Sequence, residues 1–255
     1  MLFRILLPEP RCPVCEGHCV PHDVVDFHKT CVEQKGLFLS LSGIPVYYFL
    51  CEECGFVFAP EFSSWTQADF AKFIYNQQYA DIDPDFKTVR PEINAQGLLK
   101  LFPAMNGVKH LDYGGGAGYL SDILHRSGWD SRTYDPYAGE HRVLPPDSRF
   151  QLITSFEVFE HVPDPVKLLD DLGRLLDDDG VLFFSTELSD GHVQRYKRID
   201  WWYISPRNGH ISIYSKESLR RLAERAGYRY YTILDSLHVF WKKTPAWAAH
   251  ILPKG

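Results

Sequence analysis

Residues 109–124 read Lys-His-Leu-Asp-Tyr-Gly-Gly-Gly-Ala-Gly-Tyr-Leu-Ser-Asp-Ile-Leu, and this stretch decides the fold. The pattern predicts a buried strand that ends in Asp112, a turn through glycines, and an amphipathic helix whose apolar side chains recur at helical spacing. A turn of this kind presents backbone N–H groups to a nucleotide at the start of the helix. A glycine-rich turn that binds no ligand is the alternative interpretation of the same residues.

The spacing of the glycines distinguishes between nucleotide-binding motifs. Gly114, Gly116 and Gly118 stand at alternate positions. A dinucleotide fingerprint, G-x-G-x-x-G, would instead place its last glycine at Tyr119. The second strand is predicted to end at Asp135, about 20 residues further on, where a carboxylate can bind ribose hydroxyls. An ordinary turn aspartate before proline is the alternative for Asp135.

The run D-x-G-x-G-x-G from Asp112 to Gly118 resembles motif I of the class I S-adenosylmethionine (SAM) dependent methyltransferases. Segments similar to later parts of that family follow in order: a strand over 150–157, a Glu-x-x-Glu-His segment at 157–161, a strand over 181–186 and a hairpin over 228–241. The resemblance implies an α/β fold with a Rossmann-like sheet and a terminal antiparallel hairpin; residues 141–144 are predicted as a brief third strand. The cofactor-binding residues that it implies are Asp112, Gly114, Gly116, Gly118, Asp135, Pro136, Tyr137, Phe156 and Glu157.

Four of the six cysteines form two C-x-x-C pairs, Cys12 with Cys15 and Cys51 with Cys54. Two such turns can supply four thiolates to one tetrahedral Zn²⁺, a closed shell that is typical of structural sites. The pattern predicts a small N-terminal zinc ribbon, with strands over 24–27, 46–50 and 56–58. Two disulfides or redox C-x-x-C chemistry are the alternatives.

The chain has 255 residues, of which 45% are apolar, enough for one α/β domain and an appendage. We predict a zinc-ribbon module over 1–60, a helical linker or lid over 61–103 and a SAM-binding domain over 104–255. Helices are predicted over 66–75 and 84–102. Candidate lid residues from this part are Tyr75, Tyr79 and Arg90.

The formal net charge of −6 argues against general nucleic-acid binding. Residues 1–8 are too short for a secretory core, and no apolar run reaches membrane-spanning length. We therefore expect a cytoplasmic protein with reduced thiols that does not act at a membrane. The oligomeric state is left open.

The long aromatic segment 190–210 is expected to bind the methyl acceptor. Its runs Trp-Trp-Tyr and Gly-His resemble the corresponding segment of methyltransferases that have an N-terminal zinc-binding region and that modify sugars, polysaccharide precursors or other metabolites. Its basic side chains suit a phosphate- or nucleotide-bearing acceptor. The predicted acceptor-binding residues are Tyr196, Trp201, Trp202, Tyr203 and Arg207, and the candidate proton acceptors, in order of preference, are His210, His161 and His192.

The favoured function is methyl transfer from SAM to a hydroxyl group of a small molecule. Two other classes stay open. A nicotinamide oxidoreductase shares the strand-glycine-helix element, although its glycine register differs. A non-catalytic zinc-ribbon adaptor would keep the metal and lose affinity for SAM. A hydrophobic lid without acceptor contacts is the alternative for segment 190–210.

Overall fold

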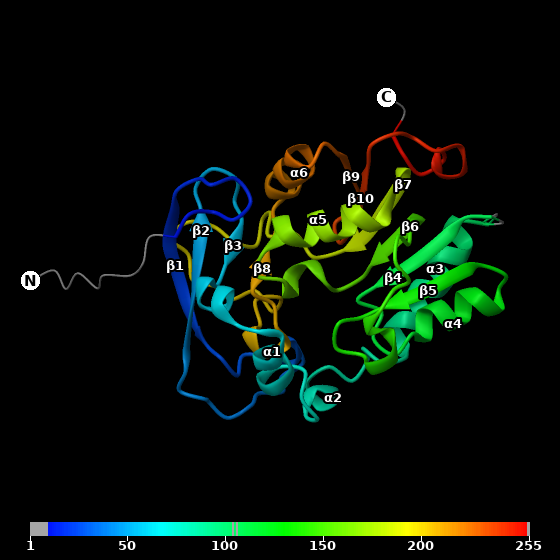
Figure 1. Ribbon diagram of the computed structural model, residues 1–255. Coiled ribbons are helices and arrows are strands. Elements are labelled where there is room, and N and C mark those ends of the chain that lie inside the picture. The colour runs from blue at the N-terminus through cyan, green and yellow to red at the C-terminus, as the bar shows by residue number, and fades with distance from the viewer. Residues whose placement is uncertain (1–9, 104, 106, 254–255) are drawn as a thin grey trace, which may run out of the picture.

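The computed structural model describes residues 10–103, 105 and 107–253, and within them two β-sheets lie side by side (Figure 1). The four-stranded sheet has the order β1-β2-β3-β8, and the six-stranded sheet has the order β5-β4-β6-β7-β10-β9. The strands are β1 Cys19–Asp26, β2 Pro45–Cys51, β3 Val57–Phe58, β4 Lys109–Tyr113, β5 Asp130–Tyr134, β6 Phe150–Ser155, β7 Leu176–Ser185, β8 Ser212–Ile213, β9 Arg229–Leu234 and β10 Leu237–Trp241. The helices are α1 Gln67–Phe73, α2 Tyr79–Ile82, α3 Val89–Leu101, α4 Tyr119–Arg126, α5 Pro165–Leu175 and α6 Lys216–Arg225.

The six-stranded sheet has the architecture of a nucleotide-binding α/β fold. Strands β5, β4, β6 and β7 are parallel, and β10 pairs antiparallel with both β7 and β9. Parallel strands are joined by crossovers that cover both faces of the sheet, so their side chains are apolar on both sides. In β6, Leu152 and Ile153 accordingly enter different hydrophobic clusters. The predicted Rossmann-like sheet with a terminal antiparallel hairpin is confirmed.

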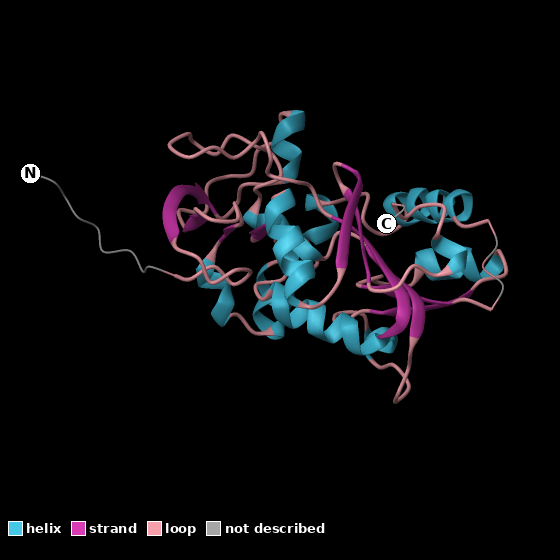
Figure 2. Ribbon diagram, turned by 90° about the horizontal axis from the view of Figure 1, so that it is seen from above, coloured by secondary structure: helices cyan, strands magenta, loops and turns pink. Residues whose placement is uncertain are grey.

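Helices pack on both faces of this sheet (Figures 1 and 2). Leu98 of α3 and Leu124 of α4 are buried in one hydrophobic cluster, whereas Leu172 of α5 and Leu222 of α6 are buried in the other. These side chains belong to the apolar stripes that helical periodicity predicts. The loops at the carboxyl ends of β4, β5 and β6 are left to form the site.

The predicted third strand over 141–144 is wrong, because this part of the chain contains a 3-10 turn, Gly139–Arg142. The backbone N–H of Asp135 donates to the carbonyl oxygen of His141 at 3.0 Å, which folds the chain back over the end of β5. Pro145 follows and has no N–H to donate to a neighbouring strand. The sheet is therefore abbreviated at this edge.

Strand β7 also begins earlier than predicted, at Leu176 rather than at Val181. Phe150 of β6 pairs with Leu176 and Leu152 pairs with Val181, so residues 177–180 form an irregularity in the pairing. Extra residues of this kind bulge from the ladder. The acidic run at 177–180 thus belongs to the strand instead of a separate turn.

The four-stranded sheet joins segments that are distant in the sequence. Strands β1, β2 and β3 come from the predicted zinc ribbon, whereas β8 follows the aromatic segment 190–210. In the antiparallel pairing of β3 with β8, Val57 lies opposite Ile213 and Phe58 lies opposite Ser212. The sheet therefore connects the modules proposed over 1–60 and 104–255.

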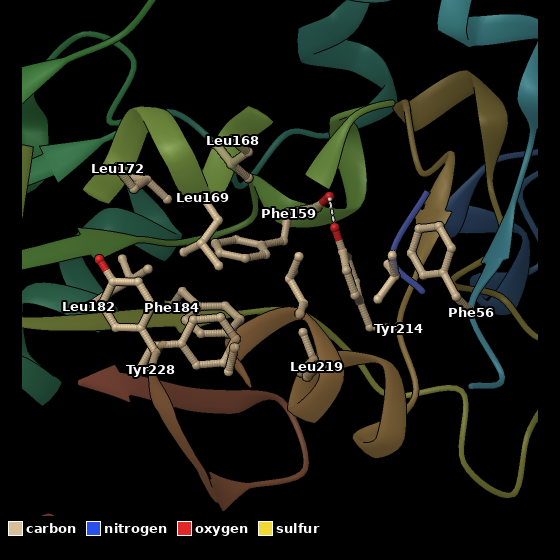
Figure 3. Packing of buried hydrophobic residues seen from close by; sticks show 14 of the residues in the cluster. Phe56, Phe159, Leu168, Leu169, Leu172, Leu182, Phe184, Tyr214, Leu219 and Tyr228 are labelled. Carbon is tan, nitrogen blue, oxygen red and sulfur yellow. Dashed lines mark hydrogen bonds between the residues drawn. The ribbon is translucent and has the colours of Figure 1, made fainter. Parts of the chain in front are cut away.

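The two modules also share a hydrophobic core. Figure 3 shows Phe56, beside β3, packed against Tyr214 at the start of the α6 region. The ring centroids of Phe56 and Tyr214 are 5.0 Å apart, and those of Phe159 and Phe184 are 4.0 Å apart in a stacked pair. The hydroxyl group of Tyr214 donates to the carbonyl oxygen of Phe159 at 3.2 Å. Apolar contact is thus continuous from the ribbon to the six-stranded sheet.

Within residues 10–253, excluding 104 and 106, no helix combines the length and the apolar content that crossing a membrane requires.

Candidate functional site

The glycine turn after β4 has a backbone that only glycine adopts easily. The φ angles of Gly114, Gly116 and Gly118 are 81°, 57° and 84°, all in the left-handed region. Gly115 is constrained by space, since a Cβ atom there would lie 2.2 Å from Oδ2 of Asp112. Burial raises the pKa of Asp112 to about 7, and Thr154 donates a hydrogen bond to its Oδ1 atom at 3.1 Å. The turn therefore wraps closely around a buried carboxyl group.

Asp135 ties the glycine turn to the end of β5. Its Oδ2 atom accepts a hydrogen bond from the backbone N–H of Gly116 at 2.9 Å, and its Oδ1 atom accepts one from Tyr137 at 2.7 Å. Both strands contribute their carboxyl ends to the same edge of the sheet, which is where ligands bind in such folds. The predicted cofactor residues are thus brought together.

A cavity of about 1030 Å³ opens beside this turn. Its volume is at the upper end of the range for small-molecule sites, about 300–1,000 Å³. The predicted cofactor residues that line it are Asp112, Gly114, Gly116, Asp135, Pro136, Tyr137, Phe156 and Glu157. Gly118 begins α4 as its N-cap and is not among the described residues that line the cavity.

The helical segment before β4 covers the opposite side of the cavity. Tyr75, Tyr79 and Arg90, the candidate lid residues, all line it. The ring centroids of Tyr75 and Tyr137 are 4.8 Å apart, so this segment contacts the tyrosine whose backbone N–H donates to Asp135. Arg90 pairs with Asp83 at 2.5 Å and presents a cation to the cavity.

Glu157 stands where the chain leaves β6. Its φ angle is 55°, a left-handed conformation that is uncommon for a residue with a side chain and is enriched at functional sites. The hydroxyl group of Ser185 makes two hydrogen bonds to Glu157. It accepts from the backbone N–H of Glu157 at 2.9 Å and donates to Oε1 of Glu157 at 2.8 Å. Burial raises the pKa of Glu157, although Arg90 opposes the rise. The carboxyl group is thereby held at the cavity wall.

His161 is the predicted proton acceptor that lines the cavity. Burial lowers its pKa to about 3, and the positive charge of Arg90 acts in the same direction. The imidazole is therefore neutral at pH 7. A neutral imidazole has a lone pair that can accept a proton from a substrate.

Behind His161 lie Glu160 and His210, whose donor atoms and those of His161 are all within 4.8 Å of one another. Burial raises the pKa of Glu160 well above its ordinary value, and Tyr203 donates a hydrogen bond to its Oε1 atom at 2.7 Å. The ring of His210 lies 4.9 Å from that of His161, and its Nδ1 atom bonds the carbonyl oxygen of Tyr203 at 2.7 Å. Nε2 of His161 lies 4.0 Å from Oε1 of Glu160. Nδ1 of His161 and Oε2 of Glu160 are buried without a hydrogen-bond partner among the described residues, and we assign no ion to this cluster.

The segment predicted to bind the acceptor is mostly buried away from the cavity. Trp201, Tyr203 and Arg207 are 6%, 1% and 4% exposed, and none of them is among the described residues that line the cavity. Trp202 does not line it either, and Tyr196 is 89% exposed. His192 stacks on Trp201 with ring centroids 4.5 Å apart. The segment thus backs the site.

Several residues that shape the site escape prediction from the sequence. Gly115 is the middle residue of a run of three glycines, but the motif counts only the alternate glycines 114, 116 and 118 and therefore omits it. Thr154 and Ser185 lie inside apolar strands and carry no local signal. Their roles depend on neighbours that only the sheet brings close.

Replacing Gly115 with alanine should weaken the binding of S-adenosylhomocysteine (SAH) by about 10-fold or more, because the new methyl group must displace Asp112 and distort the turn. Titration calorimetry would measure the loss. Gly97→Ala in α3 is the matched control, since its Cβ meets nothing within 4 Å. Equal affinity of the Gly115→Ala variant and the control would contradict the assignment of the turn as the cofactor cradle.

The four paired cysteines form a compact cluster. The Sγ atoms of Cys12 and Cys54 are 3.6 Å apart, those of Cys15 and Cys51 are 3.5 Å apart, and all four lie within 4.8 Å of one another. A tetrahedral ion with Zn–S bonds of about 2.3 Å separates its sulfurs by about 3.8 Å. A disulfide would require about 2.05 Å. The donor set and its geometry fit Zn²⁺.

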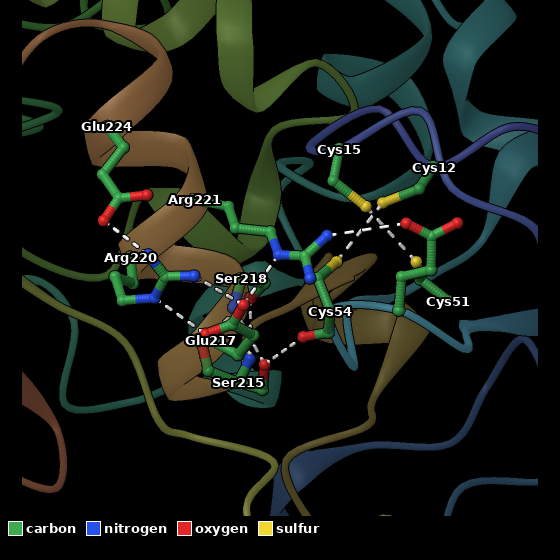
Figure 4. Close-up of polar contacts among 11 residues, drawn as sticks. Cys12, Cys15, Cys51, Cys54, Ser215, Glu217, Ser218, Arg220, Arg221 and Glu224 are labelled. Atoms are coloured by element: carbon green, nitrogen blue, oxygen red, sulfur yellow. Dashed lines mark hydrogen bonds and ion pairs between the residues drawn. The ribbon is translucent and has the colours of Figure 1, made fainter.

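The cysteine cluster sits against the N-terminal end of α6 (Figure 4). The hydroxyl group of Ser215 donates to the carbonyl oxygen of Cys54 at 2.5 Å and caps the helix by accepting from Ser218 at 3.0 Å. Arg221 bonds Glu217 at 2.7 Å and lies 3.6 Å from Glu53 between the two cysteines of the second pair. The candidate zinc site therefore lies where the four-stranded sheet meets α6.

A parallel α/β sheet with a glycine cradle, a strand-end aspartate and a cavity at the carboxyl edge defines a nucleotide-cofactor-binding protein. The model of the methyltransferase-domain family matches residues 86–233, more than half of the chain. The chain therefore belongs to this family.

Curated relatives match over a shorter stretch. The ubiquinone biosynthesis O-methyltransferase of Actinobacillus pleuropneumoniae is 35% identical over 107 residues, 31% of this chain and 46% of the relative. That of Histophilus somni is 28% identical over 137 residues, 42% of this chain and 57% of the relative. The chain thus matches only about half the length of these proteins.

Solved structures support the same fold. The 1,6-didemethyltoxoflavin-N1-methyltransferase of Burkholderia thailandensis, solved with its acceptor and SAH, has a TM-score of 0.50 and 16% identity, over 76% of this chain and 98% of that one. An O-methyltransferase family protein of the same organism has a TM-score of 0.50 and 11% identity, over 72% of this chain and 64% of that one. At these identities the likeness concerns the fold alone.

Proposed function

We propose that this protein transfers the methyl group of SAM to a hydroxyl group of a small molecule. One observation carries the proposal: the glycine cradle (Gly114–Gly116), Asp135, Glu157 and His161 all line a single cavity. Membership of the methyltransferase-domain family and the O-methyltransferase names of the curated relatives support it.

The residues present fit SAM. Gly114, Gly115 and Gly116 bring the backbone itself to the cavity wall, and Asp135 stands at the strand end where a ribose binds. When bound, SAM supplies an electrophilic methyl group on a sulfonium. Glu157 and the cradle hold the cofactor, while the aromatic lid excludes water and orients the acceptor.

We propose His161 as the proton acceptor, ahead of His210 and His192. In the transfer, a bond forms between the acceptor oxygen and the methyl carbon, the sulfur–carbon bond breaks with its electron pair remaining on sulfur, and the hydroxyl proton moves to the His161 imidazole. The products are the methyl ether and SAH. Behind His161, the ring of His210 packs edge-on against the imidazole and limits its orientation.

The acceptor class follows from the cavity walls, which are rich in aromatic rings: Trp65, Phe70, Tyr75, Tyr79, Phe86, Tyr137 and Phe156. Such walls suit a flat ring, either an aromatic alcohol or the apolar face of a sugar. Lys87 and Arg90 on the lid suit a phosphate or carboxylate on that acceptor. We therefore propose aromatic alcohols and sugar or polysaccharide precursors as the two acceptor classes to test, and a cytoplasmic setting in which the cysteines stay reduced for zinc.

The deciding experiment compares cofactors and acceptors on the intact protein. Binding of SAM and SAH, with no binding of nicotinamide dinucleotides, is the expected calorimetric result. Labelled SAM incubated with phenolic, sugar-nucleotide and cell-extract pools should then transfer label to one class. Preferential binding of a nicotinamide cofactor would overturn the proposal, and failure to bind SAH would favour the adaptor.

Asp135→Ala should abolish measurable SAH binding, because the change removes the ribose ligand and frees the N–H groups of Gly116 and Tyr137. Loss of charged hydrogen bonds of this kind costs about 1.5–3 kcal/mol each, or about 10- to 100-fold in affinity. Calorimetry would measure it. Asp130→Ala, at the exposed start of β5, is the control; wild-type affinity in Asp135→Ala would show that the cofactor binds elsewhere.

A further inference from the structure

The buried segment Trp201–His210 contacts Glu160 and Thr186 through the hydroxyl group of Tyr203, and it is also held by the N-terminal module. The Nζ atom of Lys29 donates hydrogen bonds to the carbonyl oxygens of Trp201 at 3.1 Å and of Ile204 at 2.6 Å. The hydroxyl group of Tyr48, in β2, donates to the carbonyl oxygen of His210 at 2.7 Å. One end of the segment and its final residue are thus both fixed by side chains from the zinc-ribbon region.

Further hydrogen bonds join the segment to the N-terminal module, with donors on both partners. The backbone N–H of Cys31 donates to Oδ1 of Asn208 at 2.9 Å, and that of Arg207 donates to the carbonyl oxygen of Lys29 at 3.2 Å. Immediately after His210, Ala59 donates to the carbonyl oxygen of Ile211 at 3.0 Å, which continues into the β3–β8 pairing. The segment is therefore an insertion of the catalytic domain into the N-terminal module.

The same segment supports the proposed proton acceptor. A Cβ atom on Gly209 would lie 2.8 Å from Nδ1 of His161, so the backbone there passes directly behind the imidazole. Tyr203 bonds Glu160, and the ring of His210 packs edge-on against that of His161. A shift of the segment by a fraction of an ångström moves the surface on which His161 rests.

Lys29 and Tyr48 are unusual choices for mere packing. Tyr48 is fully buried, and burial lowers the pKa of Lys29, so the lysine is held as a partly desolvated cation by two carbonyl oxygens. An apolar residue would fill the same volume without this cost, but it would not fix the positions of the two carbonyl groups.

We propose that Lys29 and Tyr48 are positioning residues for methyl transfer: through segment Trp201–His210 they set the orientation of His161, so the zinc-ribbon module is part of the catalytic apparatus. The inference rests on the proposed function and assigns the N-terminal module a role in it. It does not require either residue to touch cofactor or acceptor.

The test uses the full-length, zinc-loaded protein with Lys29→Met, Lys29→Arg, Tyr48→Phe and the control Lys35→Met, an exposed lysine of the same module. Lys29→Met should lower kcat by about 10- to 100-fold, as misplacement of a catalytic group does, with SAH affinity and acceptor KM within about threefold of wild type. Tyr48→Phe, which removes one hydroxyl group, should lower kcat by about threefold to 10-fold. Lys29→Arg should recover much of the loss, and Lys35→Met should match wild type.

Hydrogen–deuterium exchange supplies a readout that needs no acceptor. Amides of residues 203–210 should exchange faster in Lys29→Met and Tyr48→Phe, while those of α4 and β4 stay as in wild type. Wild-type kcat with unchanged exchange at 203–210 in both variants would overturn the inference, as would a fall in SAH affinity that parallels the fall in kcat. If the wild-type protein methylates nothing, the proposed function fails, and the exchange result alone still decides whether Lys29 and Tyr48 hold the segment.

Discussion

Replacing Cys54 with serine is expected to abolish zinc binding, to unfold the four-stranded sheet and to abolish methyl transfer in the same variant. Structural zinc sites of this kind contribute on the order of 10 kcal/mol, comparable to the whole stability of a domain, about 5–15 kcal/mol. Cys54 is 2% exposed, and its carbonyl oxygen accepts the Ser215 hydrogen bond at the start of α6. Loss of the metal therefore reaches both modules.

The effect of zinc loss is expected to extend beyond the N-terminal module. Strand β3 follows the second cysteine pair and pairs with β8, and β8 comes directly after the segment that backs His161. Phe56 and Tyr214 share one core. Since the ribbon and the site are bonded to the same short strand, we expect their stabilities to be coupled.

Zinc content, thermal unfolding and labelled methyl transfer measured on one preparation would check the prediction, with chelator-treated wild type as a second route to the metal-free state. Val24→Ser is the control, because Val24 lies in β1 of the same sheet, is 40% exposed and is not one of the four clustered cysteines. A Cys54→Ser protein that binds one zinc ion and melts like wild type would refute the four-cysteine site. One that loses zinc and keeps full turnover would refute the coupling.

Replacing His161 with alanine should lower kcat by about 10²- to 10⁴-fold, the usual contribution of a positioned base, while SAH affinity changes by less than about threefold. The imidazole lines the cavity, and no other predicted proton acceptor among the described residues does so. His210→Ala should have a smaller effect, about 10-fold, because His210 acts through the position of His161. His192→Ala should match wild type, since His192 is exposed and stacks on Trp201.

The pH profile gives an independent check on His161. Burial, aided by Arg90, lowers its pKa to about 3, below the ordinary value of about 6.5. The neutral form that accepts a proton is thus present at pH 7 and is lost only as pH falls through the lowered pKa. Burial raises the pKa of the neighbouring Glu160 well above its ordinary value. We expect kcat to hold well below pH 6. An acid limb near 6.5, or a fully active His161→Ala protein, would place the base elsewhere.

The sequence alone determined the elements whose chemistry is written in neighbouring residues. The glycine register at 114–118 distinguishes the cradle from a dinucleotide site because left-handed turns require glycine at particular positions. Asp135 was placed by the length of one strand-helix-strand unit. The C-x-x-C pairs predict a four-sulfur site because each turn presents two thiolates to one side.

The tertiary structure decided everything that depends on contacts between distant segments. No local pattern pairs Val57 with Ile213 or brings Lys29 to the carbonyl oxygen of Ile204. An aromatic segment such as 201–210 has the same composition whether it covers an acceptor or fills a core, and here its burial against the N-terminal module places it behind His161. Hydrophobic burial and hydrogen bonds across the fold set that outcome, because their energies depend on which surfaces meet rather than on which residues are adjacent in the chain.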